Sequence, residues 1–77
     1  MTIDALMAEG VTYLSASPNV TGVSTAAGVL PNSATWTAMG ARGTASVSMS
    51  LFDGTDPATW SAKAKTRWDG LLNWMAG

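Results

Sequence analysis

Two stretches of the sequence have a period of two, with apolar residues at every second position, and this alternation limits the fold more than any other feature. The first covers residues 34–39, where Ala, Trp and Ala occupy every second position. The second covers residues 44–51, where Ala, Val, Met and Leu alternate with Thr and Ser. Successive side chains of a β-strand point to opposite faces, so a period of two predicts two strands that each bury one face. The intervening Gly40-Ala41-Arg42-Gly43 supplies two glycines to a short connection, which predicts a β-hairpin over residues 34–52.

A helix is predicted before the hairpin, over about residues 2–16. Its apolar residues recur at the spacing of one helix face, with Thr2 suited to cap its start and Pro18 to end it. Gly10 falls on the apolar face. It indicates either that another backbone packs close to the helix there or that the helix ends at that residue.

A second helix is predicted after the hairpin, over residues 56–76. Asp56 is suited to the N-cap and Pro57 to the first helical position. One broad face of this helix gathers three of the four tryptophans of the chain. The residues of that face are Trp60, Ala64, Trp68, Leu71, Trp74 and Met75. A break at Asp69-Gly70 is left open.

Residues 17–33 are rich in Gly, Pro, Asn, Ser and Thr and are predicted either to be irregular or to contain one short strand around residues 20–25. The sequence therefore predicts a small α+β fold in one domain that covers residues 1–77: a helix, a hairpin with or without a third strand, and a Trp-rich helix. We expect the core to contain the following residues: Ile3, Leu6, Leu14, Val47, Met49, Leu51, Trp68 and Leu71.

Catalysis has few groups to use, because the chain has no His and no Cys. Most nucleophile and base pairings depend on one of those two residues, so we expect no enzyme and no cofactor. Asp53 and Asp56 resemble part of a cation loop, but a turn followed by a helix cap explains both carboxylates. We therefore expect no metal site.

The charge of the chain excludes a nucleic-acid partner, because its formal net charge is −1 and its pI is near 4.8. Phosphate binding draws on clustered Lys and Arg. No apolar run reaches the ~20 residues of a membrane span, and no secretory signal is visible at the start. The localisation stays open.

Association with other protein chains is the function that composition favours. Only 12% of the residues are charged, and residues 10–41 contain no charged side chain at all. A chain this short without disulfide or metal gains little net stability from folding alone, and a partner subunit would supply the remainder. We expect a homo- or hetero-oligomer.

Two surfaces are candidates for that association. The strand over residues 44–52 has no charged residue or Pro to prevent pairing with other chains, so Ser46, Ser48 and Ser50 either lie on a central strand under loops or complete a sheet with a neighbour. On the second helix, Arg67 is predicted to lie within the tryptophan face. There it either stacks on an indole or forms an interface hot spot with Trp60 and Trp74.

Three functions remain as hypotheses. The first is a non-catalytic structural subunit of a larger assembly, with a minor bacteriophage virion component, from capsid or tail, as a setting that the composition fits. The second is a peripheral membrane protein that places the Trp-rich helix on a bilayer. The third is a small regulatory module that binds another protein.

Overall fold

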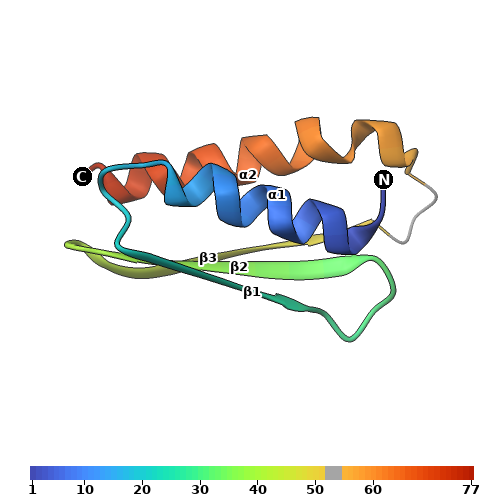
Figure 1. The fold of residues 1–77 in the computed structure, drawn as a ribbon, viewed down its shortest axis with the longest axis horizontal. Coiled ribbons are helices and arrows are strands. Elements are labelled where there is room, and N and C mark those ends of the chain that lie inside the picture. The colour runs from blue at the N-terminus through green and yellow to red at the C-terminus, as the bar shows by residue number, and fades with distance from the viewer. Residues whose placement is uncertain (52–54) are drawn as a thin grey trace.

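The computed structural model describes residues 1–51 and 55–77, and its elements follow in the order helix, three strands, helix (Figure 1). The elements are α1 Ile3–Ser15, β1 Gly22–Ala27, β2 Ser33–Gly40, β3 Gly43–Ser50, the short 3-10 helix η1 Pro57–Thr59, and α2 Trp60–Met75. The predicted α+β class is therefore confirmed, and the possible third strand is present as β1.

The three strands form an antiparallel sheet in the order β1-β2-β3. The tight turn between β2 and β3 joins the paired residues Gly40 and Gly43, and Gly43 has a φ of 131°, which side chains rarely allow. Between β1 and β2, Asn32 takes a left-handed conformation with a φ of 52°. Both connections therefore depend on residues that tolerate a positive φ.

Both helices lie side by side on one face of the sheet and run in the same direction (Figure 1). Helix α1 packs on β1 and β2, whereas α2 packs on β3.

The Thr2 hydroxyl accepts a hydrogen bond from the Ala5 amide at 3.1 Å, and the Asp56 carboxylate accepts one from the Ala58 amide at 3.1 Å. Helix α2 continues without a break through Asp69-Gly70, so the possible break there does not occur.

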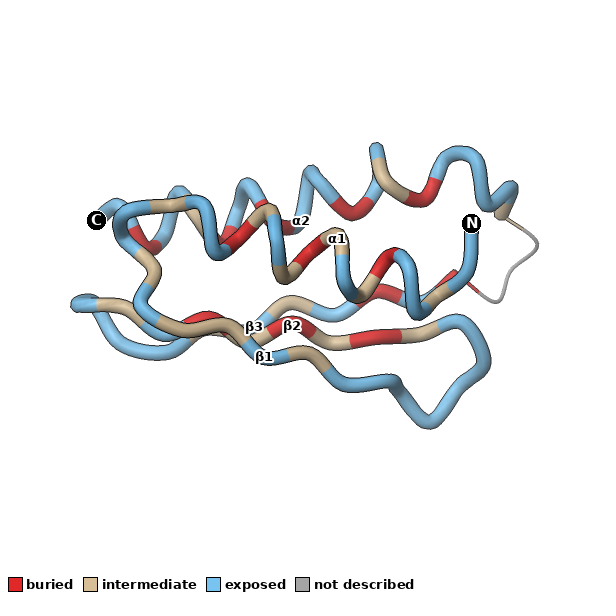
Figure 2. The backbone as a smooth tube through the Cα atoms, in the orientation of Figure 1, coloured by how far each residue is buried: buried red, intermediate tan, exposed pale blue. Residues whose placement is uncertain are grey.

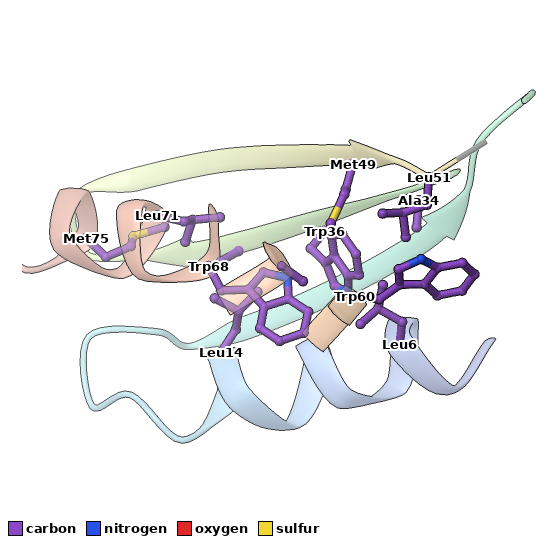
Figure 3. Close-up of a cluster of buried hydrophobic side chains, with 12 residues drawn as sticks. Leu6, Leu14, Ala34, Trp36, Met49, Leu51, Trp60, Trp68, Leu71 and Met75 are labelled. Atoms are coloured by element: carbon purple, nitrogen blue, oxygen red, sulfur yellow. The ribbon is translucent and has the colours of Figure 1, made fainter. Parts of the chain in front are cut away.

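The core lies between the sheet and the two helices, and its largest side chains are Trp36, Trp60 and Trp68 (Figure 3). Trp36 from β2 and Trp68 from α2 are both fully buried and meet edge to face, with ring centroids 5.3 Å apart. The Trp36 indole N–H donates to the Met7 carbonyl of α1 at 3.1 Å. A Cβ at Gly10 would lie 2.7 Å from Cζ2 of Trp68 and 2.8 Å from Cδ1 of Trp36. Gly10 thus makes room for two indole rings rather than for another backbone, and α1 does not end there.

The alternation in β2 and β3 decides which side chains reach this core, and Figure 2 shows buried and less buried residues alternating along β2. Of the residues predicted for the core, six are buried: Leu6, Leu14, Met49, Leu51, Trp68 and Leu71. Ile3 and Val47 are half-buried and pack against the core from its rim. The largest addition to the predicted set is Trp36.

Candidate protein interface

The face of the sheet opposite the helices is an uncharged surface of hydroxyl groups. Thr35 and Ser48 share a hydrogen bond of 2.7 Å between their hydroxyls, and Thr37 and Ser46 share one of 2.8 Å. These pairs lie directly across from each other in the register of β2 and β3. Ser46, Ser48 and Ser50 are all exposed on this side. The hydroxyls therefore satisfy one another across the strands and leave an uncharged surface.

β3 forms one edge of the sheet, so the alternative in which it is a central strand is wrong. The Leu51 amide donates to the Asn32 carbonyl at 3.0 Å, which fixes the odd-numbered residues of β3 as those that bond to β2. The backbone N–H and C=O groups of Ser46 and Ser48 consequently point away from the sheet. Within the described part of the chain, no backbone group bonds to them. This edge is open to pairing with another strand.

A groove runs between this edge and α2, with a volume of about 290 Å³. Its lining is mostly apolar and comes from both elements: Ala45, Ser46 and Val47 of β3, and Thr66, Arg67, Gly70, Leu71 and Trp74 of α2. The exposed edge of β3 therefore forms one wall of a groove rather than part of a flat surface.

Trp74 lines the groove and is itself in contact with Arg42. The Arg42 guanidinium stacks 4.5 Å from the Trp74 ring centroid, and it donates to the Trp74 carbonyl at 2.7 Å. Arg42, in the tight turn of the hairpin, is thus held by α2. Trp74 is 38% exposed, which leaves part of its ring available to a partner.

Trp60 lies elsewhere than predicted, whereas Arg67 lines the groove beside Trp74. Trp60 is only 4% exposed, and its indole N–H donates to the Thr55 carbonyl at 3.3 Å, so its assignment to an interface is wrong. Arg67 is exposed at the side of α2 that faces β3, outside the buried tryptophan face. Across residues 1–51 and 55–77, no hydrogen-bond acceptor, carboxylate or ring pairs with its guanidinium.

Charged groups divide between the two sides of α2. On the side of α1, the Tyr13 hydroxyl donates to the Asp69 carboxylate at 2.5 Å, and the Ser61 hydroxyl donates to Glu9 at 2.6 Å. The hydrogen bond to Asp69 raises the pKa of Tyr13 above its ordinary value near 10, and burial and the carboxylate charge act in the same direction. On the side of β3, Lys63 lies one helical turn before Arg67. Among the described residues that line the groove, Arg67 carries the charge, and Lys63 lies outside the lining on the same side of α2.

No family model matches this sequence, and no curated protein or solved structure is significantly similar to it. Neither described helix is long and apolar enough to cross a membrane. The described residues also contain no group of acidic side chains that could hold a metal ion. Asp56 caps η1, while Asp53, the other carboxylate considered for a cation, lies outside the described residues.

The groove was missed by reasoning from sequence, although one signal for it was present. Lys63, Arg67, Gly70 and Trp74 recur at intervals of three and four residues, which places them on one side of a helix. Hydrophobic periodicity gives no weight to a charged residue or a glycine, so this second stripe did not stand out.

Proposed function

We propose that this chain is a non-catalytic assembly subunit that associates with other protein through the open edge of β3. The observation that carries the proposal is the set of outward-pointing backbone groups at Ser46 and Ser48, on a strand without a charged residue or Pro that pairs, among the described residues, with β2 alone. Monomeric proteins normally protect such an edge, because it otherwise pairs with the strands of other chains. An unprotected edge is consistent with a strand whose partner is another chain.

The groove beside the edge supports the same proposal. Exposed strands on monomers are usually flanked by water, whereas this one is flanked by apolar side chains of α2. A strand added here would gain main-chain hydrogen bonds from β3 and would bury apolar side chains against α2. Both contributions are typical of peptide recognition at sheet edges.

The biological setting is a separate part of the proposal. A minor virion component of a bacteriophage fits the charge-poor, hydroxyl-rich composition. A regulatory module that binds one protein would use the same edge. We do not favour the peripheral membrane protein, because Trp60 and Trp68 are buried in the core and only Trp74 of that face is partly exposed.

The experiment compares two lysine substitutions on opposite edges of the sheet. Ser48→Lys places a charge on the β3 edge, and Ser24→Lys places one on the same face at the β1 edge. Both residues are exposed, so both variants should remain folded by circular dichroism. The size of the particle that contains each variant is then measured by gradient sedimentation of native extracts.

We expect the wild-type chain and Ser24→Lys to sediment in a particle much larger than 7.9 kDa and Ser48→Lys to sediment as the free chain. Two results would contradict the proposal. One is a wild-type chain that sediments as a monomer. The other is a Ser48→Lys variant that assembles as well as the wild type.

A further inference from the structure

The helix layer of this fold is wider than its sheet. Packed helices lie about 8–10 Å apart and strands about 4.8 Å apart, so two helices cover about 16–20 Å and three strands about 14 Å. The difference approaches the width of one strand. Helix α1 packs on β1 and β2, whereas α2 packs on the edge strand β3, so the surplus width lies beyond the β3 edge. The groove occupies that space.

Gly70 has no packing role inside the chain. It lies in the interior of α2, where a glycine costs about 1 kcal/mol relative to alanine, and it lines the groove. A Cβ added at Gly70 would meet no atom within 4 Å, in contrast to Gly10, which two indole rings require to be small. A chain in the groove that approaches the α2 backbone accounts for the small residue at this position.

The charges at the groove select among possible occupants. Arg67 lines the groove without a partner in the described residues, and Lys63 lies on the same side of α2. If a second copy of this chain paired through its own β3, the Lys63 and Arg67 side chains of the two copies would face each other across the interface between them. Both α2 helices would also compete for the same space beyond the edge. Like charges brought together in this way oppose association, whereas a carboxylate would be attracted.

We propose, building on the proposed function, that the groove binds one extended acidic segment of a different protein, which adds beside β3 as a fourth strand. Its backbone bonds to the outward N–H and C=O groups of Ser46 and Ser48. Its apolar side chains, at every second position, contact Val47, Leu71 and Trp74. A carboxylate of the segment pairs with the Arg67 guanidinium.

The probe is a library of random peptides of about ten residues, displayed on phage and selected on the immobilised chain. We expect the recovered peptides to alternate apolar residues and to contain more Asp and Glu than Lys and Arg. Their affinities are then measured by fluorescence anisotropy. Arg67→Glu should weaken binding at least about tenfold, whereas Arg67→Lys should retain most of it.

Two further variants distinguish a direct contact of the peptide in the groove from an effect of net charge or of helix stability. Lys65→Glu makes the same charge change on the opposite side of α2, where the Lys65 ammonium lies 5.9 Å from the Tyr13 ring, and it should bind within about twofold of the wild type. Gly70→Ala should raise the melting temperature of the free chain and weaken peptide binding several-fold. A glycine without a role at the interface would give only the first of these effects.

The inference is overturned if no peptide is recovered, if the recovered peptides are basic or lack alternation, or if Lys65→Glu and Arg67→Glu weaken binding equally. These results are distinguishable from a failure of the proposed function. Suppose that Ser48→Lys loses assembly and that the selection recovers basic peptides. The proposal of pairing at the β3 edge would then stand, and only the acidic character of the added strand would be excluded.

Discussion

Gly10→Ala tests how tightly α1 packs against the two buried tryptophans between the helices and the sheet. Alanine normally stabilises a helix interior by about 1 kcal/mol relative to glycine. Here the added methyl would lie 2.7 Å from Trp68 and 2.8 Å from Trp36, well inside the contact distance of about 3.5–4.0 Å. One of these rings, or the whole of α1, must therefore move by about 1 Å.

The cost of that movement follows from how Trp36 is held. Inserting a methyl into a packed core typically costs about 1–3 kcal/mol. Displacing Trp36 also weakens its hydrogen bond to the Met7 carbonyl, which contributes about 1 kcal/mol. After the helix gain of about 1 kcal/mol is subtracted, Gly10→Ala should destabilise the fold by about 1–3 kcal/mol. At about 4–8 °C per kcal/mol for a domain of this size, the melting temperature should fall by about 5–20 °C.

The assay is urea and thermal unfolding followed by far-UV circular dichroism, with Gly70→Ala as the matched control. Gly70 lies in a helix interior as Gly10 does, but its Cβ would meet open space. The control should therefore gain about 0.5–1 kcal/mol. If Gly10→Ala is as stable as Gly70→Ala, then α1 does not pack against the two tryptophans as described.

Three other perturbations probe the core and the contact between the helices. Trp36→Phe should lower the free energy of unfolding in urea more than Trp68→Phe does. Trp36 would lose its hydrogen bond, whereas the buried Trp68 indole N–H has no partner in the described residues. Equal losses of unfolding free energy would refute this reasoning. Tyr13 is the only tyrosine, so its ultraviolet titration should give a pKa above that of free tyrosine, and Asp69→Asn should lower it. A group with a raised folded pKa stabilises below its unfolded pKa near 10, so stability should fall as the pH rises through the folded value, and Tyr13→Phe should abolish that fall. Met49→Asp should prevent folding, because Met49 is only 4% exposed and the carboxylate would have no partner there; a native circular dichroism spectrum would contradict its placement.

The local elements could be predicted from sequence because each has a local physical cause. Alternation specified β2 and β3, Thr2 fixed the start of α1, and the face of α2 placed Trp68 in the core. Asp56 caps the 3-10 helix η1, so the α-helix predicted from residue 56 begins only at Trp60. β1 was only a possibility, because its polar and glycine-containing sequence has no period of its own. Its pairing with β2 stabilises it, and pairing between distant segments is not encoded in a short window.

The candidate site depended on tertiary arrangement, which explains why it was only partly predicted. The unprotected strand over residues 44–52 was visible as a composition without charge, but its place at the sheet edge follows from the strand order. Trp60 was misplaced because a helical projection defines an apolar arc without showing how much of that arc the sheet covers. Arg42 could be matched to Trp74 only once the hairpin lay beside the end of α2.

The central claim is that β3 pairs with a strand of another protein, and amide hydrogen exchange tests it most directly. The N–H groups of Ser46 and Ser48 point outward and have no backbone partner in the described chain, so they should exchange rapidly in the free protein. In the assembled protein both should become strongly protected, while the α2 amides on the side of α1, near the half-buried Ser61, keep their exchange pattern. Association that leaves the Ser46 and Ser48 amides in rapid exchange would contradict the account.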